Sequence, residues 1–178
     1  MSENRNEVLA SESSLNQTAR RLVECLGRQQ IKMVLAESCT CGRAVAALGT
    51  VSGVSQFLCG GLVVYRPESK SQWLGLDPAW LAEVSTESLT CSEALAVAAL
   101  RHTPEAQFSL AITGDLDPSA APTKQGRVFL AAARRQSEEG EGKLFGGREV
   151  RLQSAERLSR QIEAAQNLLQ FGIDLWDG

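Results

Sequence analysis

Apolar residues recur at helical spacing in two long segments near the ends of the chain, residues 15–26 and residues 158–169. An apolar residue at every third or fourth position is typical of an amphipathic helix that buries one face. We therefore expect a first helix that ends near Gly27 and a long closing helix. The polar residues 1–11 are expected to form a loose N-terminal tail, followed by a single domain over residues 12–178.

Short apolar runs between these helices predict the strands of a sheet. They are rich in Val, Leu, Ile and Ala and cover residues 31–37, 57–65, 107–113, 127–133 and, with a weaker pattern, 144–152. Runs of this length and composition are typical of buried strands. The Gly60-Gly61 pair inside the second run predicts a bulge or a close backbone approach.

Shorter helices are predicted between the strands. They begin at Arg43, at Glu68 and near Pro78, which suits the first turn of a helix. Thr90 and Glu93 form a T-x-x-E capping box, which predicts a further helix that runs to about Arg101.

The alternation of helices and strands predicts an α/β domain, a three-layer α/β/α sandwich. The four-stranded portion that follows residue 57 includes two pairs of consecutive strands with no helix between them. Parallel strands need a long crossover connection, so such pairs are expected to be antiparallel. The sequence therefore predicts a mixed sheet.

Composition and charge narrow the classes of partner. The chain has 178 residues, of which 43% are hydrophobic and 22% charged, and its net charge is −3. Proteins that bind nucleic acid in general need a large positive field, so nucleic acid is not an expected partner. No apolar run approaches the length of about 18 residues that spans a bilayer, and no signal peptide is evident. We expect a soluble cytoplasmic protein with reduced cysteines, and its net charge does not exclude a small anionic ligand.

The turn Glu37-Ser38-Cys39-Thr40-Cys41-Gly42, between the first strand and the next helix, is the first candidate for a functional site. Backbone N–H groups at a helix N-terminus are unpaired and bind anions. Small residues at such a turn also serve simply as helix caps, and the turn alone does not separate the two roles.

A serine with no histidine nearby is the second candidate. Ser55 is followed by Tyr65 and Lys70, whereas the only histidine, His102, lies in a polar stretch at a helix end and is expected to be solvated. A Ser-His-Asp triad is thereby disfavoured, and a serine hydrolase would need lysine or tyrosine as its base. Lysine can act as a base if burial lowers its pKa, but a lone lysine in a short helix is more often solvated.

The loop Gly114-Asp115-Leu116-Asp117-Pro118 is the third candidate, because it follows a predicted strand. Open α/β sheets place ligands in loops at the carboxyl ends of their strands. Two carboxylates without a third ligand make a poor metal site, so Asp115 and Asp117 are interpreted as turn formers. A metal site is therefore not expected in this loop.

Four segments in register resemble the CinA C-terminal domain family, whose members are nicotinamide mononucleotide (NMN) deamidases. The family patterns A-E-S-x-T-G-G, P-G-[SA]-S, V-x-Y-S-N-x-x-K and R-E-x-[IV]-R are similar to residues 36–42, 52–55, 63–70 and 148–151 of this chain. The resemblance covers about residues 15–169 and implies an α/β/α sandwich with a mixed sheet. It also implies hydrolysis of the carboxamide of NMN to nicotinate mononucleotide and ammonia, without a metal or an organic cofactor.

Carried over by position, the resemblance implies that Ser55 is the nucleophile and that Tyr65 and Lys70 activate it. It implies that eight further residues bind or orient the substrate: Ser38, Cys39, Thr40, Gly42, Thr113, Gly114, Arg148 and Arg151. Relatives form dimers, so a homo-oligomer is expected.

The chain departs from the family pattern at three places. Cys41 replaces the first glycine of the G-G pair, Arg66-Pro67 replaces Ser-Asn, and the family loop G-I-A-G-P has gained two negative charges as residues 114–118. Carboxylates beside a phosphate site weaken the binding of NMN. Two alternatives therefore stay open: a hydrolase that acts on another amide, and a catalytically silent protein that binds a nucleotide or a partner.

Overall fold

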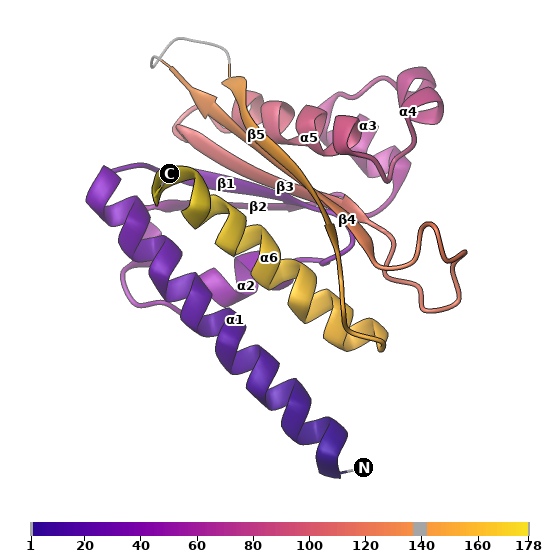
Figure 1. The fold of residues 1–178 in the computed structure, drawn as a ribbon. Coiled ribbons are helices and arrows are strands. Elements are labelled where there is room, and N and C mark those ends of the chain that lie inside the picture. Colours follow the sequence, from indigo (N-terminus) through magenta and orange to yellow (C-terminus); the bar gives the residue numbers. More distant parts are fainter. Residues whose placement is uncertain (1, 137–141, 178) are drawn as a thin grey trace.

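The computed structural model describes residues 2–136 and 142–177, and it consists of one sheet with helices on both faces (Figure 1). The elements along the chain are α1 (Ser2–Gln29), β1 (Met33–Glu37), α2 (Arg43–Gly49), the 3-10 turn η1 (Val54–Gln56), β2 (Leu58–Val63), α3 (Pro67–Leu74), α4 (Pro78–Val84), α5 (Leu89–His102), β3 (Phe108–Gly114), β4 (Arg127–Arg135), β5 (Gly142–Arg151) and α6 (Arg157–Asp177).

The five strands form a mixed sheet in the order β2-β1-β3-β4-β5. Strand β1 is parallel to both of its neighbours, whereas β4 is antiparallel to β3 and to β5. The predicted α/β class and mixed sheet are confirmed. Strands β2 and β3 lie on opposite sides of β1 and are both parallel to it. The carboxyl ends of β1 and β3 therefore lie next to each other, at a point where the order of the strands reverses. Open α/β sheets bind ligands at such points.

Helices α1, α2 and α6 cover one face of the sheet and α3, α4 and α5 the other (Figure 1). Strand β3 contributes to both cores, since Phe108 and Leu110 pack toward α1 and α6 while Ala111 packs toward α5. A strand that is buried on both faces needs mostly apolar residues, which is why the residues of β3 between Ser109 and Thr113 are all apolar. The one polar residue in its middle, Ser109, donates a hydrogen bond of 2.7 Å to Ala96 O of α5.

Two helices begin at other residues than the sequence predicted. Helix α1 begins at Ser2, so residues 2–11 are helical and the expected loose tail is wrong. Val8 in this segment packs against the core and so supports the helix. The polar composition of the segment did not reveal this contact. Helix α5 begins at Leu89, because Ser88 is the N-cap and its Oγ accepts a hydrogen bond of 3.1 Å from Cys91 N. Thr90, the expected cap, is thus the second residue of the helix.

The glycine pair in β2 has the expected effect on the sheet. Met33 pairs with Leu58 while Val34 pairs with Gly60, so Cys59 is an extra residue in a bulge. A Cβ atom on Gly61 would lie 3.0 Å from the side chain of Val45 in α2. The bulge and the close approach are both confirmed. None of the helices in the described ranges is long and apolar enough to cross a bilayer.

Candidate active site

A cavity of about 350 Å³ opens at the carboxyl ends of β1 and β3. Segments that are far apart in the sequence form its wall: the turn after β1, the second residue after β2, the segment before α5, the loop after β3 and the first residue of α6. The polar side chains that line it are Ser38, Tyr65, Glu87, Asp115, Asp117 and Arg157.

Ser38 is hydrogen-bonded to a buried lysine at this cavity. Lys70 Nζ lies 3.1 Å from Ser38 Oγ and 2.8 Å from Val64 O, and the lysine is only 1% exposed. Burial lowers the pKa of Lys70, because an ammonium group loses its hydration there. A neutral amine next to a hydroxyl can take the hydroxyl proton, so this pair has the geometry of a serine nucleophile with a lysine base.

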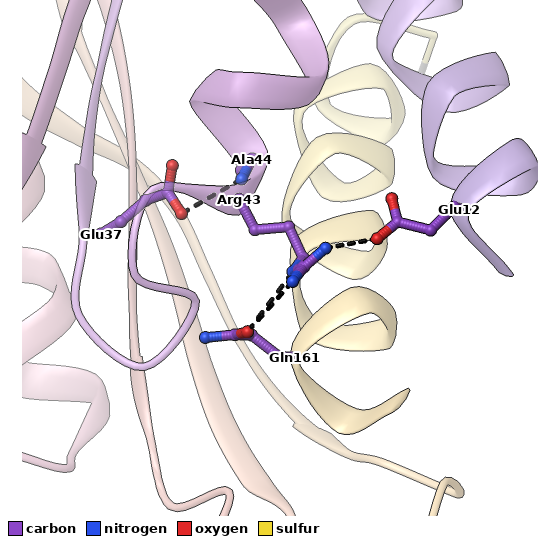
Figure 2. Close-up of polar contacts among 5 residues, drawn as sticks. All are labelled: Glu12, Glu37, Arg43, Ala44 and Gln161. Carbon is purple, nitrogen blue, oxygen red and sulfur yellow. Dashed lines mark hydrogen bonds and ion pairs between the residues drawn. The ribbon is translucent and has the colours of Figure 1, made fainter. Parts of the chain in front are cut away.

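The turn that carries Ser38 is held by the carboxylate of Glu37, which is 1% exposed. This carboxylate accepts hydrogen bonds from the backbone N–H groups of Gly42 (3.1 Å), Ala44 (3.2 Å) and Val45 (2.8 Å) at the start of α2. Figure 2 shows the contact with Ala44. Glu37 therefore occupies the anion-binding helix N-terminus that the sequence marked as a ligand site. The turn positions Ser38 and does not offer this N-terminus to a substrate.

Backbone strain accompanies this arrangement. Gly42 has a φ of 88° and Cys41 a φ of 53°, so both lie in the left-handed region. A non-glycine residue there costs roughly 1 kcal/mol. Cys41, which replaces the first glycine of the family's G-G pair, thus carries a side chain at a position of positive φ.

Arg43 ties the same turn to two other helices. Its guanidinium is paired with Glu12 of α1 and lies 3.4 Å from Gln161 Oε1 of α6 (Figure 2). Gln161 in turn donates a hydrogen bond of 3.3 Å to Cys39 O. The residue next to Ser38 is thus fixed from α6 as well as from β1.

Glu37→Gln is expected to lower the free energy of unfolding by about 1.5–3 kcal/mol, because an amide NH₂ would face backbone N–H groups that now bond to a carboxylate. Urea unfolding of the two proteins measures the difference. Glu83→Gln, which removes an exposed carboxylate from α4, is the matched control and should change stability by less than about 0.5 kcal/mol. Equal stability of the Glu37 variant and the wild type would show that the cap is energetically unimportant.

Tyr65 and Arg157 form a second polar pair at the cavity. Tyr65 is 50% exposed, and its hydroxyl accepts a hydrogen bond of 2.9 Å from Arg157 Nη2. The phenolic proton is left to be donated to a ligand. Arg157 was missed by the sequence analysis, because the R-E-x-R motif drew attention to Arg148 and Arg151 and nothing local distinguishes an arginine at the start of a helix.

The loop after β3 brings carboxylates to the cavity. Asp115 Oδ1 accepts a hydrogen bond of 2.8 Å from Asp117 N, and Asp117 Oδ1 accepts two, from the N and Oγ of Ser119. These bonds confirm the turn-forming role of both residues, and those from Ser119 lower the pKa of Asp117. Glu87, which the sequence did not single out, has its pKa raised by partial burial and by the negative charge of Asp115.

The structure does not bring Ser55 to Lys70. Ser55 is exposed in η1 before strand β2, whereas Lys70 follows that strand in α3. The six residues of β2 separate the two positions by roughly 20 Å at about 3.3 Å per residue. The geometry of one chain therefore does not support the expectation that Lys70 activates Ser55, because a serine before a strand and a lysine after it lie at opposite ends of that strand.

Only part of the expected binding set lines the cavity. Ser38, Cys39 and Gly114 do, but burial raises the pKa of the Cys39 thiol to about 12, so its sulfur is unreactive. Thr40 and Gly42 line a separate groove of about 530 Å³ near α1, α2 and α6. The Thr40 hydroxyl is buried there without a hydrogen-bond partner among the described residues.

The remaining three expected binding residues have structural partners. Thr113 is fully buried, and its hydroxyl lies 2.8 Å from Ser92 Oγ of α5. Arg148 pairs with Asp174 of α6 at 2.9 Å. Arg151 donates a hydrogen bond of 2.6 Å to Pro122 O. None of the three lines the cavity of Ser38, so their expected role in substrate binding is not supported.

Gly114→Ala is expected to destabilise the protein by about 2–4 kcal/mol. A Cβ atom at this position would lie 2.5 Å from Arg127 O, and the residue has a φ of 156°, which side chains rarely adopt. Gly49→Ala is the matched control, since no atom lies within 4 Å of its Cβ position in α2 and alanine favours a helix. Thermal unfolding should separate the two variants, and equal melting temperatures would contradict the steric argument.

Comparisons with known proteins agree with this architecture. Residues 15–168 match the family described as the CinA C-terminal domain. A CinA-like protein from Geobacter sulfurreducens is 36% identical over 107 residues, which cover 59% of this chain and 26% of that protein. The chain spans about a quarter of the length of the curated relatives it matches.

Solved structures share the fold. The competence/damage inducible protein CihA from Agrobacterium tumefaciens has a TM-score of 0.81 and 26% identity, with 91% of this chain and 95% of that chain covered. A CinA superfamily protein from Klebsiella pneumoniae has a TM-score of 0.79 at 22% identity, with 92% and 99% covered, which is a likeness of fold alone.

Proposed function

The chain belongs to the CinA C-terminal domain family, and we propose that it is an amidohydrolase in which Ser38 is the nucleophile and Lys70 the general base. The observation that carries this proposal is the distance of 3.1 Å between Ser38 Oγ and the Nζ atom of a lysine that is 1% exposed. A buried amine of lowered pKa has few structural uses, and its one side-chain partner here is a hydroxyl at the wall of a cavity.

In the first half of the reaction, Lys70 takes the proton of Ser38 while Ser38 Oγ attacks the carbonyl carbon of the amide. The C–O bond forms, and the carbonyl π electrons move to oxygen in a tetrahedral intermediate. Its collapse breaks the C–N bond. The ammonium of Lys70 returns its proton to the departing nitrogen, so ammonia leaves and an acyl ester remains on Ser38.

Water completes the cycle. With Lys70 again as base, a water molecule gives a proton to the amine and adds to the ester carbonyl. The bond to Ser38 Oγ then breaks, Lys70 returns the proton to Ser38 Oγ, and the acid product loses its remaining proton to solvent and leaves as a carboxylate. Tyr65 lines the same cavity and has a proton to donate, because its oxygen accepts from Arg157. It can stabilise the oxyanion or assist the leaving group.

The first substrate to test is NMN, since the resemblance to the family implies that its carboxamide is hydrolysed. A cavity of about 350 Å³ is within the size range of small-molecule sites. The sequence of steps requires only groups of this chain, the amide and water.

The purified protein should release ammonia from NMN and form nicotinate mononucleotide in equal amounts, followed by a coupled ammonia assay and by mass spectrometry of the product. Failure to hydrolyse NMN or any related carboxamide would contradict the proposal. It would favour the alternative of a catalytically silent member of the family that binds a nucleotide or a partner.

A further inference from the structure

The charges around the cavity do not match those of a phosphorylated substrate. Three carboxylates line it, Glu87, Asp115 and Asp117, against the single guanidinium of Arg157. Lys70 adds no lasting positive charge if it serves as a neutral base. A dianionic phosphate that entered this cavity would meet more negative than positive side chains.

The one guanidinium already has partners. Arg157 Nη2 donates to Tyr65 Oη at 2.9 Å. The positive charges of Arg157 and Arg160 also help to lower the pKa of Asp117, which means that Asp117 lies close enough to attract both. A phosphate at Arg157 would therefore have to compete with a carboxylate that belongs to the protein.

Other cations near the loop do not compensate for the excess of negative charge in the cavity. Arg127 is engaged by both carboxylate oxygens of Glu149, at 2.6 and 3.0 Å. Lys124 lies with Glu87 and Asp115 at a smaller adjoining cavity of about 80 Å³ and does not line the larger one. The negative charge that faces Ser38 is thus only partly compensated.

We propose that the cavity selects an amide whose remaining part is positively charged and carries no phosphate, such as a pyridinium or ammonium amide. This inference rests on the proposed hydrolysis at Ser38 and narrows its substrate class. In a cavity partly shielded from water, a cation is attracted by the three carboxylates and a dianion is repelled by them, over distances at which salt screens little.

Nicotinamide riboside and NMN are the probes, because they share the pyridinium ring and the carboxamide and differ by the phosphate. Binding of each is measured by calorimetry to the Ser38→Ala protein, which cannot form the ester. We expect the riboside to bind about tenfold more tightly than NMN or better. Lys70→Met supplies a second background without hydrolysis if Ser38→Ala folds poorly.

Asp117→Asn in the same background should reduce this preference about tenfold. The amide keeps the Oδ1 acceptor for Ser119 and removes only the charge. The control is Glu83→Gln, which removes an exposed carboxylate of α4 outside the cavity and should leave the preference unchanged.

Equal or tighter binding of NMN, no binding of either probe, or an unchanged preference in Asp117→Asn would each overturn the inference. A wild-type protein that hydrolyses NMN faster than the riboside would retain the proposed function and refute the charge selection. A protein that binds the riboside selectively but hydrolyses neither amide would retain the charge selection and refute the proposed hydrolysis.

Discussion

Ser38→Ala is expected to lower kcat/KM for the hydrolysed amide by about three orders of magnitude or more, because among the described residues Ser38 has the one hydroxyl that is hydrogen-bonded to the amine of Lys70. Substrate affinity should change little, since alanine keeps the turn and removes one oxygen. The loss should therefore appear in kcat. Steady-state ammonia release, with calorimetry for binding, measures both quantities. The acyl ester on Ser38, trapped by acid quench and seen by mass spectrometry in the wild type, should be absent in the variant.

Ser55→Ala is the matched comparison, because this exposed serine lies before β2, at the end of the strand opposite to Lys70. We expect it to retain most of the wild-type activity. The reverse pattern, with Ser55→Ala inactive and Ser38→Ala active, would refute the Ser38 assignment. It would also require Ser55 to act from a second copy of the chain, since β2 separates it from Lys70 within one copy.

Lys70→Met is expected to abolish hydrolysis as completely as Ser38→Ala, while the protein still folds. Methionine fills a similar volume and removes an amine that is unfavourable to bury when charged. Loss of the hydrogen bonds to Val64 O and Ser38 Oγ opposes this gain. The stability measured by urea unfolding should therefore change by less than about 2 kcal/mol. An active Lys70→Met protein would exclude lysine as the base.

The pH dependence of activity should follow the ionisation of Lys70. Burial lowers the pKa of Lys70 below its ordinary value of 10.5, and only the neutral amine can accept the proton of Ser38. The kcat/KM of the wild type should therefore rise with pH through the folded-state pKa of Lys70 and level off below pH 10.5. Tyr65→Phe, which keeps the lysine, should lower the rate and preserve this rise. A profile that does not rise with pH anywhere below 10.5 would contradict a lysine base.

The free energy of unfolding should rise with pH because of Lys70. Between the folded-state pKa of Lys70 and 10.5, the unfolded chain binds a proton at this residue and the folded chain does not. The free energy of unfolding contributed by Lys70 therefore rises with pH across this window and is constant on either side of it. The difference between the wild type and Lys70→Met, measured by urea unfolding at several pH values, isolates this contribution.

Most elements could be predicted from periodicity alone, because strands and helices bury different patterns of residues. The five strands lie within about two residues of the predicted segments, and Pro78 begins its helix as expected. The predictions were wrong where the structure of a segment depends on a contact with residues far away in the sequence. Residues 2–11 are polar enough to suggest a tail, yet they continue α1 because Val8 reaches the core. Ser88 caps α5 in place of the expected Thr90 because its backbone is extended there.

The sequence by itself determined the α/β class and the mixed sheet. Each of these depends on residue type or on local spacing. The tertiary structure alone decided which serine meets the lysine, because this depends on which ends of the strands carry the two residues. It also decided that Glu37 occupies the helix N-terminus offered by the turn, and that Arg157 reaches Tyr65 from 92 residues away. Long-range neighbours of this kind follow from the order and direction of the strands, which no local pattern encodes.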